Sequence, residues 1–411
     1  GSGGTAILAR PFSLSSVVSA SQKLAALNDI AVRLGDVSAT GAVNLGFGDT
    51  LDLDIAVSVN KFDLDAFLAS ATLNAEPGKT AAGSEKATAT AESSKAAPVA
   101  LPENVNATLD LTIDVLRYNR GVVRQVGLRA AMSNGSITLD RASALLPGGS
   151  DVSALGFLQM VDGAPLFEGE VAAASDNLRA VFDWLSIDTQ GVSNDRLRGF
   201  SYASKIKATP ESVEIPDINL RLDASTMTGA LALAIRERPG LGLRLAIDRI
   251  NLDAYLPKSR RRQAAPKTDS GAVKAKSGTR ENTSAGGANG LALLDTFDAN
   301  FDARVERLTV QGATLRKLHA EGLLVGGDVN FRSLRVTDAV GVAAKLRGDV
   351  RGLGGAPAVA LKFDVAGTDL TRTFRWLGVN PPLTPRQLGK VTAKGSLDGD
   401  FKAVSFKAAV T

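Results

Sequence analysis

The chain contains one long stretch twice. Residues 107–188 align without a gap on residues 299–380, at a constant offset of 192 positions. The two tryptophans of the chain, Trp184 and Trp376, fall on equivalent positions of this alignment. Since a chance match rarely brings both copies of so scarce a residue into register, the sequence indicates a duplicated module.

The region before this stretch is duplicated as well, at an offset of 188: Leu64-Asp65-Ala66 matches Leu252-Asp253-Ala254. The two offsets place four extra residues of the second copy in the segment that matches residues 68–107. We therefore expect a first module over residues 1–195, a second over 196–386, and the start of a third, truncated module over 387–411. Because the chain begins with Gly1-Ser2-Gly3-Gly4 and stops inside that third copy, we expect it to be an interior part of a longer protein.

Two segments of low complexity interrupt the modules, at about 72–100 and about 257–289. Both lack hydrophobic periodicity, so the sequence predicts that they are disordered insertions. The second insertion is rich in lysine and arginine. These charges suit either a solvated linker or a contact with anionic membrane headgroups, and the lack of neighbouring aromatic or amphipathic residues favours the linker.

Outside the insertions, hydrophobic residues alternate with polar ones along many segments. A period of two places every second side chain on the same face of a sheet, so one face is apolar and the other is polar. The pairs Asn134-Gly135, Gly148-Gly149 and Gly326-Gly327 are typical of hairpin turns. The sequence therefore predicts a mostly β fold: a long, twisted, mainly antiparallel sheet in duplicated modules that forms an elongated apolar groove, with a few short helices.

Helical patterns are few and short. Residues 176–185 and 368–377 place apolar residues at spacings of three and four behind an Asp or Asn, which predicts a short capped helix in each. Residues 62–68 and 250–256 predict further short turns, with Asp63 and Asn251 as caps. Since Trp184 and Trp376 lie at helical spacing among apolar residues, they are interpreted as helix anchors rather than ligand-stacking residues. Such short helices cannot cover the sheet.

The chain offers little catalytic chemistry. It has no cysteine and a single histidine, which excludes a thiol nucleophile and argues against soft metal sites. His319 corresponds to Gly127 in the other copy, so we interpret it as a strand or loop residue near the surface. Asp52 and Asp54 alternate with apolar residues, which indicates a solvent-facing row rather than a calcium site. With 47 basic and 43 acidic residues, no nucleic-acid groove is indicated. The sequence predicts no enzyme, no cofactor and no metal.

The apolar face must pack on another sheet, close on itself or hold a hydrophobic molecule. Composition alone favours a closed core, because exposed aliphatic faces normally aggregate. A strand of nine residues nevertheless spans roughly 30 Å, long enough to house an acyl chain. The candidate groove residues are apolar members of the alternating strands: Leu51, Leu53, Ile55, Val57, Leu109, Leu111, Ile113, Val115, Ile218, Leu220, Leu222, Leu231, Leu233, Leu241, Leu243, Leu245, Val359, Leu361 and Phe363.

The elements follow one order in both copies. In the first copy, the strand Leu53–Val59 precedes the turn segment Phe62–Leu68, the insertion, the strand Leu109–Val115, the Asn134-Gly135 hairpin and the helix that ends at Trp184-Leu185. Over most of the chain outside the insertions, this order resembles the AsmA-like family of bacterial envelope proteins. The resemblance implies a periplasmic protein, anchored in the inner membrane by an amino-terminal helix, whose elongated sheet forms an apolar groove. It also implies bridge-like transfer of phospholipid and support of outer-membrane integrity.

Two hypotheses follow. The first is a non-enzymatic β-groove that binds or transports phospholipid, or another acyl lipid, between the inner and outer membranes, with envelope proteins as possible partners and no nucleic acid. The second is a structural β-repeat scaffold or surface interaction protein with a closed apolar core. An apolar face that is open along the repeat would favour the first hypothesis, and apolar rows sealed against each other would favour the second.

Overall fold

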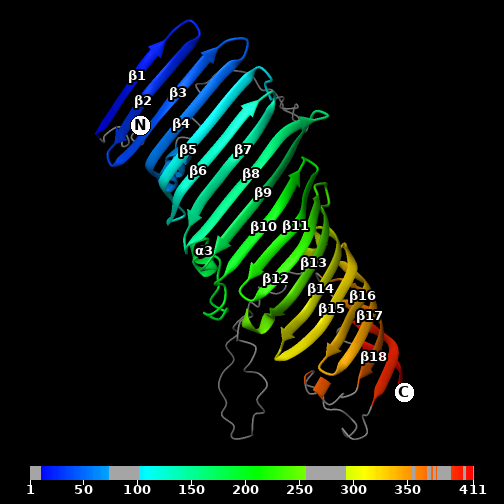
Figure 1. Cartoon of the computed structure of the whole chain (residues 1–411). Helices are drawn as coiled ribbons and strands as arrows, with labels where there is room; N and C mark the ends of the chain where they lie inside the picture. The colour runs from blue at the N-terminus through cyan, green and yellow to red at the C-terminus, as the bar shows by residue number, and fades with distance from the viewer. Residues whose placement is uncertain are drawn as a thin grey trace, which may run out of the picture. The chain divides into compact units, whose positions relative to one another are not determined.

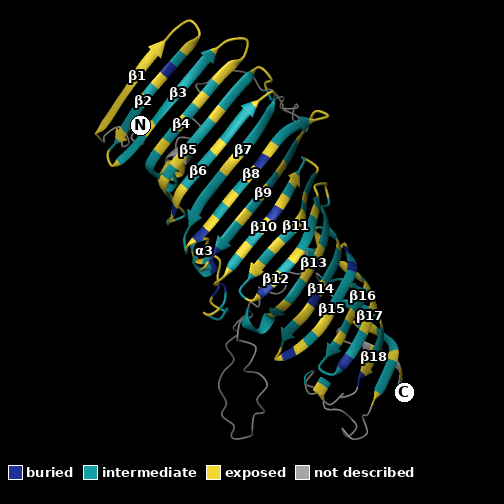
Figure 2. Cartoon of the chain, viewed as in Figure 1, coloured by how far each residue is buried: buried dark blue, intermediate teal, exposed yellow. Residues whose placement is uncertain are grey.

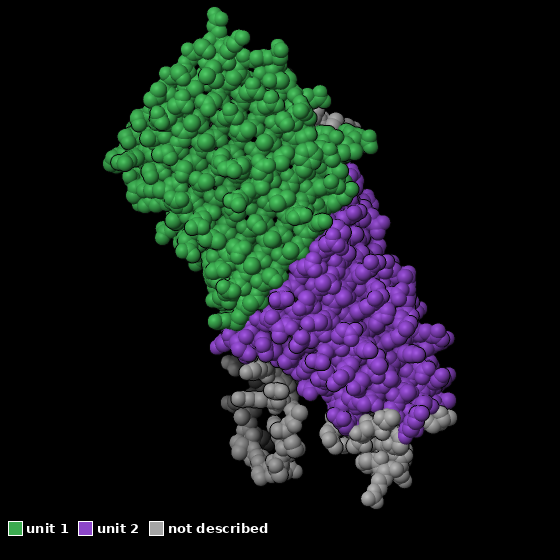
Figure 3. Space-filling model, in the orientation of Figure 1, with its two compact units in different colours: residues 1–187, 198–210 green, residues 188–197, 211–411 purple. Residues whose placement is uncertain are grey.

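The computed structural model describes residues 11–73, 101–255, 293–353, 357–367, 372–373, 376, 390–400 and 404–410. The chain divides into two compact units, one of residues 1–187 and 198–210 and the other of residues 188–197 and 211–411 (Figure 3). Apart from residues 72 and 73, which end a helix, the expected insertions lie outside the described residues. The module boundaries at 195 and 386 stay a prediction.

The first unit is a sheet in which each strand pairs with the next one along the chain (Figure 1). All of these pairs are antiparallel except β4–β5, which is parallel. Helix α2 (Leu64–Leu73) lies in the connection between these two strands. A second helix, α3 (Leu178–Trp184), follows β9. The strands are β1 (Phe12–Ala20), β2 (Leu24–Leu34), β3 (Val37–Phe47), β4 (Leu51–Asp63), β5 (Val105–Tyr118), β6 (Gly121–Ser133), β7 (Ser136–Leu146), β8 (Ser150–Val161), β9 (Ala164–Ser175) and β10 (Phe200–Ala208).

The second unit repeats this arrangement. Its strands also pair in chain order, and β13–β14 is its parallel pair. Two single 3-10 turns, η1 (Leu252–Ala254) and η3 (Leu293–Asp295), lie between β13 and β14 in the chain. The strands are β11 (Ser212–Leu222), β12 (Ser225–Ala234), β13 (Gly240–Asn251), β14 (Asp298–Val310), β15 (Ala313–Val325), β16 (Asp328–Ala339), β17 (Val342–Arg351), β18 (Ala358–Gly367), β19 (Val391–Asp400) and β20 (Val404–Val410).

The sequence repeat is also a repeat of backbone irregularities. The β2–β3 ladder shifts register between Leu27 and Ile30, and the β11–β12 ladder shifts between Ile215 and Ile218, 188 positions later. The β7–β8 and β16–β17 ladders shift at positions 139/142 and 331/334, which are 192 positions apart. Bulges add twist and fix register. Both copies therefore build the same sheet with the same corrections to its register.

The predicted mostly β, mainly antiparallel fold is confirmed, and so are the hairpins. Asn134 and Gly135 adopt φ of 48° and 66°, and Gly326 and Gly327 adopt 59° and 78°. Positive φ at both central residues marks the turn type whose twist matches that of the flanking strands. Gly148-Gly149 connects β7 to β8, also with positive φ. These turns fix which residues face each other in the adjacent strands.

The helix predictions are confirmed in part. The helix expected within residues 176–185 is α3. Residues 62 and 63 belong to β4, and α2 begins only at Leu64, where the Asp63 carboxylate accepts the backbone N–H of Ala66 at 2.9 Å. Asn251 makes no capping bond and ends β13, so its predicted role is wrong. Asn177 precedes α3, but its side chain makes no capping bond either. Most of the helix expected at 368–377 lies outside the described residues.

Candidate functional site

The ladders of the first unit align apolar residues from strand to strand. Residues that pair directly in a sheet point to the same face. One row crosses all strands from β1 to β10 without a polar residue: Val18, Leu27, Val43, Ile55, Leu109, Ala130, Leu139, Gly156, Gly169 and Ile206. The row beside it is equally apolar: Ala20, Ala25, Leu45, Leu53, Ala107, Met132, Ile137, Leu158, Phe167 and Ala208.

A third row runs from β2 to β10 on the same face and becomes polar only at its end. It consists of Ile30, Gly41, Val57, Leu111, Leu128, Ala142, Ala154, Val171 and Ser204. We call the face made by these rows the apolar face of the first unit. Its rows are about 40 Å long, because neighbouring strands lie about 4.8 Å apart.

The second unit has a matching apolar face. Its central row is Ile215, Leu231, Leu243, Phe301, Gly322, Phe331, Gly348, Leu361 and Leu397. The rows on either side are also free of polar residues. They are Val213, Leu233, Leu241, Ala299, Leu324, Val329, Val350, Val359 and Gly399, and Ile218, Gly229, Leu245, Ala303, Ala320, Leu334, Leu346, Phe363 and Gly395.

Phenylalanine rings cover the glycines of these rows. A Cβ on Gly156 would lie 2.6 Å from the ring of Phe167, and a Cβ on Gly322 would lie 2.8 Å from the ring of Phe301. The rings of Phe301 and Phe331, which pair with Gly322 from either side, meet edge-on with centroids 6.1 Å apart. The apolar surface therefore continues across positions that have no side chain of their own.

The structure places most of the sequence-predicted groove residues on these rows or on rows next to them. Ile113 pairs with Val59 and Val126, and Leu220 pairs with Met227, so both continue the apolar face. Two of the predicted residues lie elsewhere in the ladders. Val115 pairs with Lys61 and Arg124, where the row becomes charged. Leu222 pairs with Ser225 beside the β11–β12 turn.

Sequence reasoning missed the contribution of β6 to β9. Leu128, Met132, Ile137, Leu158 and Phe167 complete the rows of the first unit, yet bulges and small residues hide their alternation. The Asn134-Gly135 turn was the available signal. A two-residue hairpin pairs the residues that flank it, so it sets Met132 opposite Ile137.

The predicted groove residues are half-buried rather than sealed. Leu51 is 38% exposed and Val115 is 36% exposed, and the others have intermediate exposure. Within the described part of the chain no large side chain is fully buried, and few apolar residues are buried at all (Figure 2). Side chains of a sheet face show this half-burial when they touch neighbours in the sheet and no second layer packs over them. The closed core favoured by composition does not match this burial.

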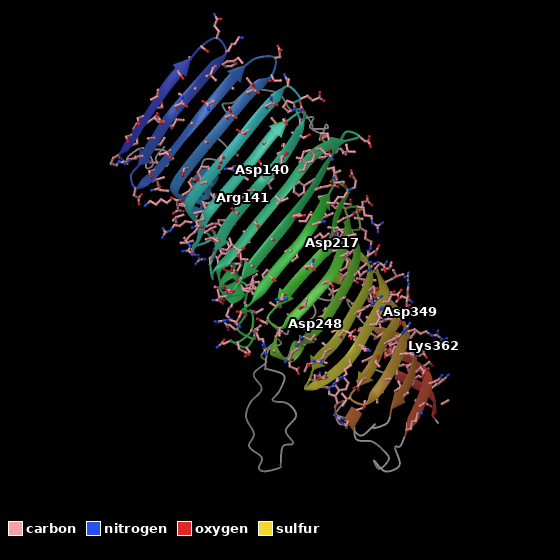
Figure 4. The ribbon with its side chains drawn as sticks, in the orientation of Figure 1. Asp140, Arg141, Asp217, Asp248, Asp349 and Lys362 are labelled. Carbon is pink, nitrogen blue, oxygen red and sulfur yellow. The ribbon has the colours of Figure 1, made fainter. Side chains whose placement is uncertain are left out.

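The opposite face of each sheet is polar and internally paired. Asp52 and Asp54 are exposed, as expected for a solvent-facing row, and accept hydrogen bonds from Asn106 at 2.8 Å and Thr108 at 2.6 Å. Figure 4 shows further charged side chains along the strands, such as Lys362 of β18. This face keeps the sheet hydrated while the other face stays apolar.

Charged side chains on the polar face bind one another. Arg129 binds Asp110, and this hydrogen bond raises the pKa of the guanidinium. His319 lies in β15 with Nε2 2.9 Å from Asp302, which also binds Arg304 at 3.1 Å. His319 is thus a half-buried strand residue. The described residues hold no cluster of three or more side chains able to bind a metal ion.

A carboxylate in each unit joins the crossover to the next hairpin turn. Asp65 accepts the backbone N–H of Asn119 at 2.8 Å and that of Arg120 at 3.0 Å, and Asp253 binds the turn residues 311–312 in the same way. The bonds from Arg120 and Asn119 lower the pKa of Asp65, because backbone N–H groups favour the charged carboxylate. These hydrogen bonds therefore fix the connection between the parallel strands β4 and β5 to the turn that follows β5.

Replacing Asp65 with asparagine is expected to remove a pH-dependent part of the stability. The folded pKa is lowered, so ionised Asp65 stabilises the fold above the pKa of the unfolded chain. This stabilisation is lost as pH falls through the folded pKa. The gap in urea midpoint between wild type and Asp65→Asn should be widest near neutral pH and should narrow by about pH 3. Asp151→Asn, at an exposed position of β8, is the control. A gap that is constant with pH would contradict this role of Asp65.

Trp184 is the helix anchor that the sequence predicted in the first copy. Its Nε1 donates to the carbonyl oxygen of Tyr118 at 2.9 Å, and the two rings meet edge-on at 6.2 Å. Asn119 in turn donates to the carbonyl oxygen of Trp184 at 2.7 Å. These contacts hold α3 against the end of the sheet.

Comparisons with protein-family models, with curated proteins and with solved structures find no match to this chain. Among the described residues, no helix is long and apolar enough to cross a membrane.

Proposed function

We propose that this protein is a non-enzymatic lipid-binding protein whose apolar faces take the acyl chains of phospholipids. The observation that carries the proposal is the set of apolar rows, aligned strand by strand in each unit and left half-buried. Monomeric proteins rarely expose apolar patches of more than a few hundred Å², and larger ones mark binding surfaces. A lipid acyl chain is a ligand that such a face fits without any specific polar residue.

The energetics of this binding are those of the hydrophobic effect. Each buried methylene contributes about 0.8 kcal/mol, so an acyl chain that lies on the rows is held along its whole length. No single residue then dominates the affinity. Equivalent rows in both units also offer a chain similar surroundings at successive positions, which suits movement along a sheet as well as storage.

The resemblance to the AsmA-like family gives this proposal a setting. We propose that the protein works in the periplasm, linked to the inner membrane, and carries phospholipid between the inner and outer membranes in support of outer-membrane integrity. Envelope proteins are its proposed partners. A scaffold with a closed apolar core is the alternative, and the half-burial of the predicted groove residues favours the open face.

The purified protein is expected to carry phospholipid. Native mass spectrometry and solvent extraction should find about one or more lipid molecules per chain, because an uncovered apolar face acquires amphiphiles from the cell. A photoreactive residue at Leu111 should crosslink to the lipid, and the same residue at Thr112, the next position and on the polar face, should not. Lipid-free and fully stable protein would count against the proposal and favour the scaffold.

A further inference from the structure

In the first unit, glycines allow α3 to pack closely on the sheet. A Cβ on Gly121 would lie 2.3 Å from Cδ1 of Trp184, and a Cβ on Gly148 would lie 2.7 Å from Cβ of Ala180. This close approach brings Nε1 of Trp184 to the carbonyl oxygen of Tyr118. The contact between helix and sheet therefore depends on two positions without side chains.

The second copy has larger residues at both positions. Ala313 replaces Gly121, and Val340 replaces Gly148 at a positive φ of 57°, a conformation that β-branched residues rarely adopt. Trp376 occupies the place of Trp184 in the repeat, yet its Nε1 is buried without a hydrogen-bond partner. Thr373 reaches the carbonyl oxygen of Val340 with its hydroxyl at 3.1 Å. The indole of Trp376 thus lacks the acceptor that pins Trp184.

A cavity of ≈ 520 Å³ lies beside Trp376. We call it the Trp376 pocket. Arg316 and Arg372 line it, as does Asp338, whose carboxylate accepts the N–H of Gly341 at 2.8 Å and lies 4.0 Å from Arg316. Its lining consists of Gln311, Gly312, Ala313, Thr314, Arg316, Asp338, Val340, Gly341, Arg372 and Trp376.

The charge around the pocket favours an anion. In the ladders, Arg316 lies between Asp338 on one side and Arg307 on the other, and Arg307 pairs with Arg249. Like charges that face each other across strands destabilise a sheet, and an anion in front of them relieves the repulsion. The two arginines of the lining outnumber the single carboxylate of Asp338, so the pocket keeps a net positive charge. In the first copy, Ala180 stands at the position of Arg372, so the second copy alone has this cation.

The donors point to a phosphate group. Two arginines line the pocket, whereas the indole N–H of Trp376 is buried and does not open into it. Each arginine can bind phosphate with two parallel hydrogen bonds, and two arginines together engage more oxygens than a carboxylate has. The cavity is larger than a phosphate needs, so an attached organic group also fits. Two residues from Arg316, Leu318 pairs with Val305 on a row that continues the apolar face.

We propose that the Trp376 pocket binds a phosphate group, either as free phosphate or as the phosphate of a lipid headgroup. The inference does not depend on the proposed acyl-chain binding, because the pocket has its own donors and its own cavity. It assigns a polar function to the second copy that the first copy lacks. Divergence at two glycine positions and at Ala180 accounts for the difference.

The two indole N–H signals in a nitrogen-15 NMR spectrum test this proposal on the whole chain. Trp376→Phe assigns the signals, and Trp184 is the internal control. Titration with inorganic phosphate, and separately with a short-chain phosphatidate below its micelle concentration, should shift the Trp376 signal saturably and leave the Trp184 signal in place. At least about tenfold tighter binding of phosphatidate assigns the site to a lipid headgroup, and equal affinities assign it to free phosphate. The absence of a saturable Trp376 shift with both ligands overturns the proposal.

Two variants make the test specific. Arg372→Ala, which restores the residue of the first copy, should weaken phosphate binding about tenfold or more through loss of a charge-assisted bond. Arg332→Ala removes a cation that pairs with Glu321 outside the pocket and should leave binding unchanged. The double change Ala313→Gly with Val340→Gly restores the two glycines of the first copy. It should let Trp376 pack on the sheet as Trp184 does, which would close the pocket and abolish binding. Unchanged phosphate affinity in both Arg372→Ala and the double variant would contradict this site, and circular dichroism checks that each variant is folded.

Discussion

Replacing Leu111 with aspartate is expected to reduce lipid crosslinking about tenfold or more while the strands remain folded. Leu111 lies in the third row of the first unit, between Val57 and Leu128. A carboxylate there prevents about four methylenes of the bound acyl chain from contacting the face, and each lost contact costs about 0.8 kcal/mol. The full loss of about 3 kcal/mol corresponds to more than 100-fold, and the acyl chain recovers part of it by shifting along the row.

The measurement uses a photocrosslinker at Val57, directly across from Leu111. Thr112→Asp is the matched control, since it adds the same charge at the next position but on the polar face, where crosslinking should not change. Leu243→Asp should act in the second unit as Leu111→Asp acts in the first, because Leu243 lies in its central row.

Aspartate also separates the open face from a closed core. In a sealed interior, an unpaired carboxylate is a severe cost and the unit unfolds. On an uncovered face, the charge stays hydrated and circular dichroism should still report strands. Global unfolding of Leu111→Asp and Leu243→Asp, with Thr112→Asp unaffected, would select the closed scaffold.

Gly121→Ala is expected to destabilise the first unit by about 2–4 kcal/mol. The added Cβ meets the ring of Trp184 at 2.3 Å and 2.4 Å, closer than any real contact. Overpacking of this kind costs about 1–3 kcal/mol, and displacement of the indole also breaks its bond to Tyr118, worth about 1 kcal/mol. Urea unfolding followed by fluorescence, in a Trp376→Phe background that leaves Trp184 as the only reporter, measures the effect.

Gly199→Ala is the matched control. Gly199 also lies in the first unit, a Cβ on it would have no heavy atom within 4 Å, and its backbone does not require a positive φ. Alanine there should be neutral or slightly stabilising, because it restricts the unfolded chain. Equal stabilities of Gly121→Ala and Gly199→Ala would show that α3 tolerates displacement and that close packing on Gly121 is not what holds it.

Local patterns predicted much of the fold. The alternation in residues 51–59 and 109–115 gave β4 and β5, and Asn134-Gly135 gave the turn between β6 and β7. The caps were less predictable. Asp63 binds the N–H of Ala66, whereas the equivalent Asn251 makes no capping bond, although each ends a strand in a parallel ladder. Equivalent positions in the two copies therefore have two outcomes, and the local pattern does not distinguish them.

The candidate site was predicted from sequence only as a set of alternating residues. Alternation shows that Ile55 and Leu109 each belong to an apolar face, but not that they face each other across a parallel crossover. That register joins strands on either side of a low-complexity segment whose sequence carries no periodic signal. The bulges at positions 27/30 and 139/142 then keep the rows aligned over the remaining strands. Register is a property of pairs of strands, which no single segment encodes.

The sequence by itself determined the repeat, the strands and the polarity of their two faces, because these follow from short-range periodicity and from turn residues that tolerate positive φ. Only the tertiary structure decided that the apolar rows align and stay half-buried, since this depends on which elements pack over them. It also separated the two tryptophans that the repeat makes equivalent. Trp184 packs on Gly121, where the methyl group of an alanine would overlap the indole ring. In the second copy that position is Ala313, and Trp376 lies beside a cavity that Ala313 also lines.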